Sequence, residues 1–367
     1  MKQQLNISDY LFQQPDLPNI STLLQLWYER NKRDLPWRNT RNPYYIWLSE
    51  VILQQTRVDQ GLAYYNRFVA RFPEIKDLAE ADEDEVLKLW QGLGYYSRAR
   101  NLHTTAKLIH SNFKDVFPSD YASILVLKGI GEYTAAAIAS FAFDQPVATV
   151  DGNVYRVLSR IFGVDEPIDT GNGKKIFAAL AQMVLDKNNP GLHNQAIMEL
   201  GALQCVPVSP DCTICPFEYM CLAKKEGRVS QLPVKKGKTI VKNRYFNYLD
   251  IRLDDYMYLN KRVGNDIWKN LYELLLIETP EKTVFEKLAL DPRFREILDT
   301  ASIKMVEPVM EIKHVLSHRI IYATFYRIHI ADDKVLQDRY IKIKVNDADS
   351  YAVSRLVHRY LEKIELL

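Results

Sequence analysis

The sequence has little that would place it in a membrane or in the secreted class. Its longest apolar stretch, around residues 135–143, is too short to cross a lipid bilayer. Its amino-terminal residues lead into no apolar segment, so we expect no signal peptide. The net charge is only +2 over 367 residues, so overall charge does not indicate a nucleic-acid partner. We therefore expect a globular protein of the cytoplasm without a membrane partner.

Cysteine is scarce, and all four copies lie in one short segment, at Cys205, Cys212, Cys215 and Cys221. A secreted disulfide fold would be smaller and would spread its cysteines along the chain. Clustered thiols therefore indicate a metal site, and the prolines among them predict an irregular loop. The C-x6-C-x2-C-x5-C spacing contains one C-x2-C pair where zinc ribbons usually have two. This favours an iron–sulfur cluster, with zinc as the alternative.

The length of the chain and a change of pattern within it predict two domains. Residues 20–223 consist of helix-forming segments separated by loops, after an extension at residues 1–19. Residues 244–367 mix strand-like and helix-like segments, which predicts an α+β domain. Residues 224–243 form a basic linker that fits a solvated connection and a phosphate contact equally well.

The expected elements follow from apolar periodicity and from turn residues. In the first half we expect helices at residues 20–28, 47–57, 82–90, 99–111, 121–127, 133–141, 154–162, 175–184 and 194–203. In the second half we expect a hairpin of residues 245–253 and 256–263, strands at 271–278 and 319–330, and helices at 282–290 and 350–364.

A glycine-containing turn, Lys128-Gly129-Ile130-Gly131, joins two of the expected helices. The glycines permit a tight, open backbone, and the N–H groups that begin the next helix form a site for a phosphate. A DNA-binding helix-hairpin-helix has this pattern, and so does an ordinary helical corner. Asp151 follows at the expected start of another helix, where it is either a structural N-cap or a carboxylate at a cleft.

These segments together resemble the helix-hairpin-helix DNA glycosylase superfamily, in which a hairpin, an aspartate and a cysteine loop of this spacing follow in this order. Within it, the chain is similar to the adenine DNA glycosylases of the MutY family. The similarity covers residues 22–222 and rests on the motifs at residues 34–38, 48–58, 92–100, 150–154 and 198–202.

The resemblance implies a multidomain protein. An all-α helix-hairpin-helix glycosylase domain with a [4Fe-4S] loop would precede an α+β MutT-like (Nudix-like) domain. It also implies a monomer that acts in the nucleoid on double-stranded DNA containing A:8-oxoG or A:G mispairs. The cluster would hold a DNA-facing loop in place rather than take part in the chemistry.

The resemblance also assigns chemical roles. Glu50 would protonate the leaving adenine and then activate water, although complementing a helix dipole in a first turn is the structural alternative. Asp151 would stabilise an oxocarbenium ion, and Tyr133 and Asn153 would orient or polarise the site. Bifunctional relatives have a lysine at the position of Tyr133, which forms a Schiff base. A tyrosine cannot do so, and we expect a monofunctional hydrolase.

The target base must leave the helical stack before it is cleaved. Trp37, Arg38 and Leu53 would line the adenine pocket, and Gln55 and Tyr95 would wedge into the duplex. An ordinary place in the core is the alternative for Trp37 and Tyr95. Further residues expected to contact DNA are Thr56, Lys128, Gly129 and Gly131.

The second half resembles a MutT-like domain but lacks the glutamate-rich run that would bind magnesium. We therefore expect recognition of 8-oxoguanine without catalysis, through Ser317 and His318. A buried strand end is the alternative for His318. The chain departs from the family pattern at Leu316, where a phenylalanine is usual, and at Gln195, where some members have glutamate.

Two other functions stay open from the sequence. A glycosylase-lyase for oxidised pyrimidines, of the endonuclease III type, is opposed by Tyr133 and by the second domain. A DNA-binding or redox-sensing protein that carries a cluster would release no base, and the pairing of Glu50 with Asp151 would then be accidental.

Overall fold

The computed structural model describes residues 17–54, 56–237, 241–298, 302–336 and 339–366. The chain divides into two compact units, Met1–Ala79 with Thr104–Gly237 and Glu80–His103 with Lys238–Leu367. A helical insertion from the first half of the sequence therefore belongs with the C-terminal unit. The domain boundaries expected from the sequence, which follow chain order, stay a prediction.

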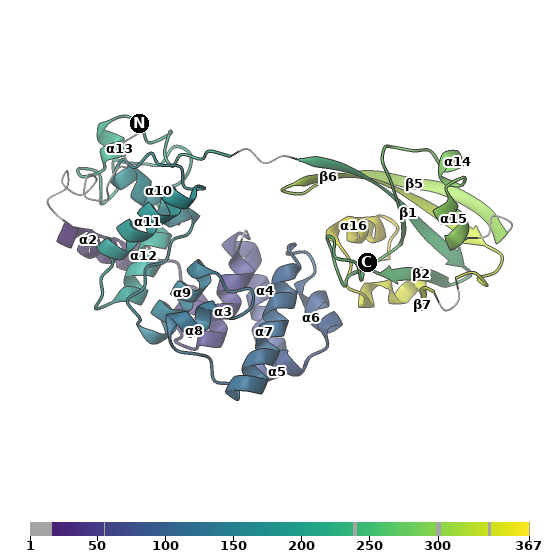
Figure 1. The fold of residues 1–367 in the computed structure, drawn as a ribbon, viewed down its shortest axis with the longest axis horizontal. Coiled ribbons are helices and arrows are strands. Elements are labelled where there is room, and N and C mark those ends of the chain that lie inside the picture. Colours follow the sequence, from purple (N-terminus) through teal and green to yellow (C-terminus); the bar gives the residue numbers. More distant parts are fainter. Residues whose placement is uncertain (1–16, 55, 238–240, 299–301, 337–338, 367) are drawn as a thin grey trace. The chain divides into compact units, whose positions relative to one another are not determined.

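Helices build the first unit (Figure 1). Its elements are α2 (Leu17–Asn31), the 3-10 helix η1 (Pro36–Arg38), α3 (Pro43–Leu53), α4 (Val58–Arg71), α5 (Ile75–Glu80), α8 (Tyr121–Leu125), α9 (Glu132–Phe143), α10 (Gly152–Ile161), α11 (Gly171–Val184), α12 (Pro190–Leu203) and α13 (Leu222–Lys225). Polar side chains fix several starting points. Asn42, Asp120, Asp151 and Thr170 each accept a backbone N–H at the start of α3, α8, α10 and α11.

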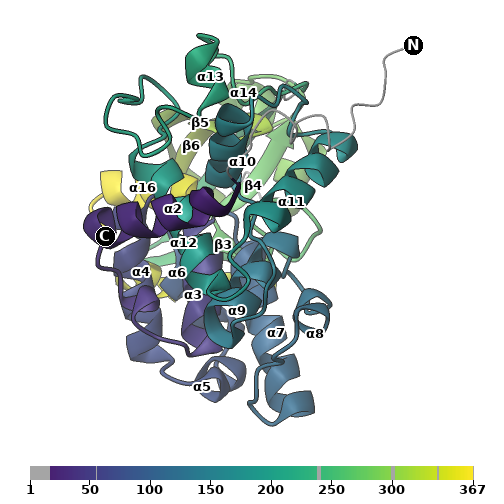
Figure 2. The same ribbon diagram turned by 90° about the vertical axis from the view of Figure 1, so that its left-hand side faces the viewer.

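One hydrophobic core joins α2, α10, α11 and α12, which lie beside one another in Figure 2. Leu24 and Tyr28 of α2 pack with Val157 of α10, Phe177 of α11 and Ile197 of α12, and all five are buried. This core packs α10 and α12 against each other, so the residues at the start of α10 keep a fixed position relative to α12.

The second unit contains a mixed seven-stranded sheet. Its strands are β1 (Lys242–Leu253), β2 (Tyr256–Lys261), β3 (Tyr272–Glu273), β4 (Leu275–Thr279), β5 (Ile303–Val315), β6 (Arg319–Ile330) and β7 (Ile341–Lys344). The order is β3-β2-β1-β6-β5, with β4 paired to β1 and β7 paired to β2. β1 and β6 run parallel, and the other pairs are antiparallel.

The side chains of β1 contribute alternately to two cores, one on each face of the sheet, because successive side chains of a strand point to opposite faces. Phe246 and Tyr248 pack with α16 (Arg355–Lys363), which follows the 3-10 helix η3 (Val345–Ser350). Leu249 and Ile251 pack with α14 (Phe285–Leu288) and α15 (Pro292–Ile297). Helices therefore cover both faces, and β1 is buried on both sides.

The helical insertion of the second unit contains α6 (Glu83–Trp90) and the beginning of α7 (Ser97–Phe113). Asp84 accepts hydrogen bonds from the Tyr272 hydroxyl and from Lys261, each at 2.6 Å. The Tyr96 hydroxyl donates to the carbonyl of Val353 at 3.2 Å. Specific polar contacts thus attach this insertion to the sheet.

The structure confirms the predicted hairpin, since β1 and β2 pair with Leu253 opposite Tyr256, and it confirms the strand at residues 319–330 as β6. The expectation that a helix runs over residues 47–57 is wrong at both ends, because α3 begins at Pro43 behind the cap Asn42 and ends at Leu53. β5 was missed because Pro308 interrupts its pattern, and an edge strand with bulges tolerates a proline.

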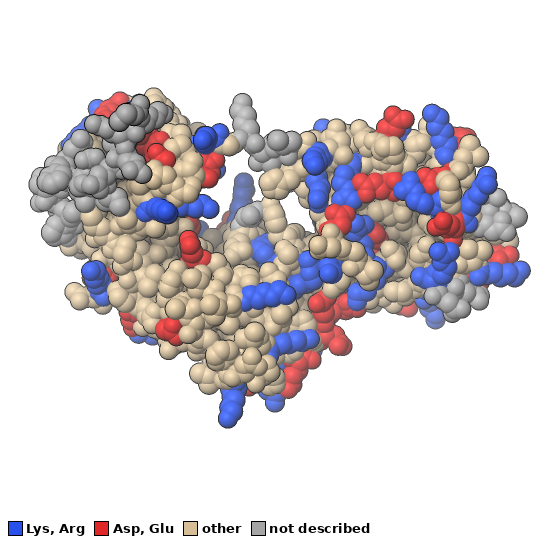
Figure 3. Space-filling model, in the orientation of Figure 1, with Lys and Arg blue, Asp and Glu red and all other residues tan. Residues whose placement is uncertain are grey.

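Within the described residues, no helix is long and apolar enough to cross a membrane. The visible face of the second unit carries positive and negative side chains side by side (Figure 3). Many of them form ion pairs, such as Arg244 with Glu278 at 2.6 Å. This interleaving agrees with the small net charge of the chain.

Candidate active site

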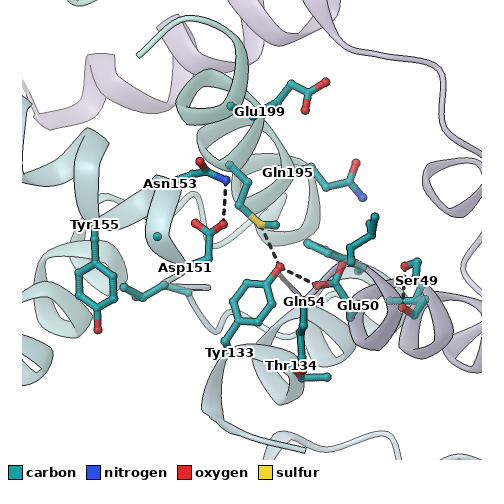
Figure 4. A pocket seen from close by; sticks show the side chains of 18 of the residues that line it. Ser49, Glu50, Gln54, Tyr133, Thr134, Asp151, Asn153, Tyr155, Gln195 and Glu199 are labelled. Atoms are coloured by element: carbon teal, nitrogen blue, oxygen red, sulfur yellow. Dashed lines mark hydrogen bonds between the residues drawn. The ribbon is translucent and has the colours of Figure 1, made fainter. Parts of the chain in front are cut away.

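A large pocket of about 1430 Å³ lies within the first unit. Glu50 enters it from α3, Tyr133 from α9, and Asp151 and Asn153 from the start of α10 (Figure 4). These four residues, predicted together from the sequence, come from three separate helices and line one pocket.

Glu50 is buried in the second half of α3, so the alternative of a first-turn dipole role is wrong. The Tyr133 hydroxyl donates a hydrogen bond to Glu50 Oε2 at 2.6 Å. Burial raises the pKa of Glu50 to about 7, and the hydrogen bond from Tyr133 opposes that rise. A carboxyl group with a pKa near neutrality can both give and take a proton at neutral pH.

Tyr133 is itself fixed as a donor. Burial and the neighbouring carboxylate charges raise its pKa well above the usual value for tyrosine, so the hydroxyl keeps its proton. The sulfur of Met198, on α12, lies 3.9 Å from the same hydroxyl. The ring is therefore held between α3 and α12, with its proton directed at Glu50.

Asp151 is both the N-cap of α10 and a pocket residue, so the two roles left open by the sequence coincide. Its Oδ1 accepts the N–H of Val154 at 2.8 Å, and its Oδ2 accepts from Asn153 Nδ2 at 2.9 Å. Burial raises the pKa of Asp151, and these hydrogen bonds counteract the rise. A Cβ at Gly201 would lie 2.6 Å from Asn153 Cβ, so the glycine at this position lets α12 pack closely against the start of α10.

Two arginines on α10 connect this site to the cysteine loop. Arg156 Nη2 donates to Asn153 Oδ1 at 2.8 Å, while its Nε donates to the carbonyl of Cys205 at 2.7 Å. Arg160, one turn later, donates to the carbonyl of Val206 at 2.8 Å and lies 3.4 Å from Cys205 Sγ. Asp151, Asn153, Arg156 and the loop therefore form one continuous chain of hydrogen bonds.

A buried carboxylate, Glu199, also belongs to the pocket lining. Glu199 of α12 accepts hydrogen bonds from Arg33 and Arg38, the shortest at 2.5 and 2.6 Å. Burial by itself would raise the pKa of Glu199, but the two guanidinium groups bring it down to about 2. Nearby, the Tyr28 hydroxyl donates to Gln195 Oε1 at 2.8 Å, which turns the amide nitrogen away from Tyr28.

The residues expected to line the adenine pocket, Trp37, Arg38 and Leu53, all border this cavity, as does Thr56. Trp37 is also 93% buried against Tyr65, with ring centroids 5.0 Å apart, so it belongs to the core as well. Gln55, expected to wedge into DNA, lies outside the described residues.

The glycine turn has the expected conformation. Gly129 has φ +79°, a left-handed value that favours glycine, and Gly131 is the N-cap of α9. A Cβ at Gly131 would meet no atom within 4 Å, so the space beside this helix start is open. The side chain of Lys128 is exposed, and its carbonyl accepts the Thr105 hydroxyl at 2.7 Å.

The remaining predicted contacts lie in the second unit. The Tyr95 ring is 48% exposed and its backbone is left-handed, with φ +47°, so it is not a core aromatic. Its hydroxyl is 2.5 Å from the Ser317 hydroxyl, in the turn between β5 and β6. His318 beside it is exposed, so the alternative of a buried strand end is wrong. The structure thus brings Tyr95, Ser317 and His318 to the same part of this unit.

The four cysteines surround one small cavity beside α10. Burial, together with the neighbouring thiols, raises the pKa of Cys215 to about 12, and a backbone hydrogen bond opposes the rise. No group of three or more His, Cys, Asp or Glu in the described chain converges tightly enough for a single metal ion. Four thiols spaced around a cavity fit a cluster of several irons.

Sequence reasoning missed Arg33, Arg156, Arg160 and Glu199. Arg156 and Arg160 are spaced four apart on a helix, which is also the spacing of a solvated basic face. Glu199 lies inside a motif that the sequence singled out, but its two arginine partners are more than 160 positions away.

Comparison with known proteins shows the family to which this chain belongs. The model of the HhH-GPD superfamily of base excision DNA repair proteins matches residues 48–183, and the NUDIX domain model matches residues 248–363. An adenine DNA glycosylase of Buchnera aphidicola (from Baizongia pistaciae) is 35% identical over 308 residues, which cover 82% of this chain and 83% of its own. The chain belongs to the adenine DNA glycosylase family.

The chain is also similar to the mouse adenine DNA glycosylase and, over part of its length, to one solved structure of a thymine-DNA glycosylase. The mouse enzyme is 41% identical over 247 residues, 64% of this chain and 48% of its own. A thermostable thymine-DNA glycosylase structure is 26% identical, has a TM-score of 0.54, and covers 57% of this chain and 97% of its own. The predicted fold, a helical glycosylase domain followed by an α+β Nudix-like domain, is confirmed.

Proposed function

We propose that this member of the adenine DNA glycosylase family hydrolyses the N-glycosidic bond of adenine mispaired with 8-oxoguanine or guanine in duplex DNA. The observation that carries the proposal is the presence of two carboxyl groups, Glu50 and Asp151, held in one pocket by different hydrogen-bond partners. Cleavage of a glycosidic bond requires a proton on the leaving group and negative charge near the sugar cation.

Glu50 is the proposed proton donor. With a pKa of about 7, the Glu50 carboxyl is protonated in a substantial fraction of the molecules at neutral pH, whereas an exposed glutamate would be almost fully ionised. After the base departs, the resulting carboxylate can accept a proton from the attacking water. The hydroxyl of Tyr133, directed at Oε2, stabilises that carboxylate form.

Asp151 is the proposed partner of the sugar cation. The N–H of Val154 and the amide of Asn153 hold both of its oxygens in place. A carboxylate oriented in this way stabilises positive charge that develops at the sugar as the bond to adenine lengthens. Asn153, positioned by Arg156, would therefore act through Asp151.

Hydrolysis without a lyase step follows from Tyr133. A Schiff base with the sugar needs an unprotonated amine close to the sugar carbon that carries the departing base. The side chain next to Glu50 is a phenol that keeps its proton. Water is therefore the proposed nucleophile, and the product is an abasic site in an unbroken strand.

Cys205, Cys212, Cys215 and Cys221 would hold a [4Fe-4S] cluster. When bound, the cluster cross-links the loop through four thiolates, and no step of the hydrolysis passes through it. Arg156 and Arg160 bind the carbonyls of Cys205 and Val206, and in this way the loop supports Asn153 and Asp151.

The C-terminal unit would read the base opposite the adenine. Tyr95 is exposed and shares a hydrogen bond with Ser317, and a planar ring beside a hydroxyl can stack on a base and bond to its edge. His318 lies next to Ser317 and is exposed. Gly129, Gly131 and Lys128 would bind a phosphate of the same DNA at the start of α9.

The experiment that tests the proposal is single-turnover release of adenine from duplexes in which adenine lies opposite 8-oxoguanine, guanine or thymine. We expect release opposite the first two bases and little opposite thymine. Glu50→Gln should abolish release, whereas Glu29→Gln, an exposed glutamate on α2, should not change it.

Two results would contradict the proposal. Release of an oxidised pyrimidine without release of adenine would make the chain an enzyme of the endonuclease III type. Efficient covalent trapping of the wild-type protein on DNA by borohydride would show a Schiff base and remove the monofunctional assignment.

A further inference from the structure

A separate cavity of about 210 Å³ lies within the C-terminal unit. It is on the face of the sheet that α14 and α15 share, and residues of β1, β5, β6 and the loop after β4 line it. Its volume equals that of roughly seven water molecules at about 30 Å³ each, which is enough for one heterocyclic base, so a sugar and phosphate attached to that base would lie at the rim.

One row of side chains forms an aromatic wall. Thr279, Tyr245, Tyr322 and Lys313 are cross-strand neighbours on β4, β1, β6 and β5. The Tyr245 and Tyr322 rings are stacked, with centroids 5.3 Å apart and planes at 16°. Lys313 Nζ lies 5.9 Å from the Tyr322 centroid, so the wall ends in a positive charge.

The next row supplies a hydrogen-bond acceptor that faces the cavity. Asn247 is 97% buried and lines the cavity, and its Nδ2 donates to the Ile277 carbonyl and to Thr279 Oγ1, each at 3.1 Å. Thr279 donates its own hydroxyl proton to the Glu281 carbonyl at 2.7 Å. Both partners of the Asn247 amide therefore present oxygen acceptors, which fixes its nitrogen toward them.

This orientation leaves Asn247 Oδ1 on the cavity side, without a hydrogen-bond donor among the residues that the structure describes. Thr324, its cross-strand neighbour on β6, lines the same cavity with a half-buried hydroxyl. An amide oxygen that faces an open cavity can accept a hydrogen bond from a ligand that enters it. The cavity is therefore chemically suited to a ligand that offers N–H groups.

An ion pair crosses the rim. Lys282, in the loop after β4, binds Glu311 of β5 at 2.7 Å, and so spans the two intervening strands β1 and β6. Their side chains are 63% and 59% exposed, and such a pair contributes little to stability. When it opens, Lys282 and Lys313 both become available to an anion beside the tyrosines.

We propose that this cavity binds the base and phosphate of one nucleotide. The base would pack against Tyr245 and Tyr322, donate an N–H to Asn247 Oδ1 and bond to the Thr324 hydroxyl. The phosphate would lie between Lys282 and Lys313. The nucleotide is either free or the terminal residue of a DNA strand. The proposal is independent of adenine release, because the cavity shares no residue with the pocket of Glu50 and Asp151.

The test measures binding of dGMP and dAMP to the full-length protein by ligand-observed NMR titration. Thr324→Val removes a hydroxyl at constant size, and Lys313→Ala removes a charge at the surface. We expect saturable binding, weakened by roughly 3- to 10-fold in each variant. Lys344→Ala, an exposed lysine on β7 outside the cavity, is the matched control and should leave binding unchanged.

A second arm separates the two sources of the ligand. A short single-stranded oligonucleotide that displaces dGMP from the wild-type protein, and binds the Thr324→Val protein more weakly, would identify a strand end as the ligand. No displacement would identify the free nucleotide. The proposal fails if neither probe binds at millimolar concentration, if Thr324→Val and Lys313→Ala bind like wild type, or if inorganic phosphate competes as well as dGMP.

Discussion

Replacing Tyr133 by phenylalanine should move the pH dependence of adenine release without changing the shape of the pocket. The hydroxyl of Tyr133 is 2.6 Å from Glu50 Oε2 and is the largest influence that lowers the pKa of Glu50. A hydrogen bond to a charged group is worth about 1.5–3 kcal/mol. Its loss should therefore raise the pKa of Glu50 by about one to two units above 7.

The direction of the effect follows from the proposed role. If Glu50 must be protonated to act as an acid, the single-turnover rate of the wild-type protein falls as pH rises through about 7. In Tyr133→Phe the same decline should begin about one to two pH units higher. The rate should be measured between pH 5 and 10 with adenine opposite 8-oxoguanine.

Tyr155→Phe provides the control. Tyr155 lines the same pocket from α10, but its ring packs on Phe177, and within the described chain the phenol that bonds to Glu50 is that of Tyr133. Removing the Tyr155 hydroxyl should leave the decline of the rate with rising pH near pH 7. If the rate of Tyr133→Phe also declines near pH 7, or at lower pH, then Glu50 is not the acid whose protonation controls the rate.

Three further predictions concern stability and positioning. Folding raises the pKa of Glu50 from 4.5 to about 7, so the ionised side chain destabilises the native state increasingly as pH rises through this range. Urea unfolding should therefore show the free energy of unfolding of Glu50→Gln rising by about 3 kcal/mol relative to wild type between pH 4.5 and pH 8. Glu199→Gln leaves two guanidinium groups without their carboxylate and should lower the free energy of unfolding at pH 7 by about 3 kcal/mol. Because the pKa of Glu199 is depressed to about 2, this deficit should shrink as pH falls from 4.5 toward 2, and a deficit independent of pH would contradict the argument. Arg156→Gln breaks the link from the cysteine loop to Asn153 and should slow adenine release about 10- to 100-fold in single turnovers, whereas the exposed Arg67→Gln should not.

The sequence was most informative where short spacing carries the chemistry. Two such patterns are the four cysteines within one loop and the aspartate directly before a glycine at a helix start. Local patterns of this kind can be recognised without knowledge of the fold. Glu50 could be singled out only through the resemblance of its motif, because a lone glutamate on an apolar helix has no sequence signal of its own.

The rest depended on long-range contacts. Glu199 looks like any surface glutamate until Arg33 and Arg38 are brought against it from the other end of the domain. Arg156 and Arg160 have the spacing of a solvated face, yet both are buried. Burial, and therefore the pKa of Glu50, depends on helices that are far apart in sequence and cannot be read from the chain order.

The attachment of the α6 insertion to the C-terminal sheet has a consequence for anyone who shortens this protein. Cutting the chain after Gly237 would remove residues 238–367 and leave a fragment made almost entirely of helical sequence. Asp84 would then lose Tyr272 and Lys261, and the Tyr96 hydroxyl would lose its acceptor at Val353. The truncated protein would keep Glu50, Asp151 and the cysteines, yet the loop that carries Tyr95 would lose the surface on which it is folded. The activity of such a fragment would therefore reflect the loss of these contacts as well as the loss of the C-terminal strands.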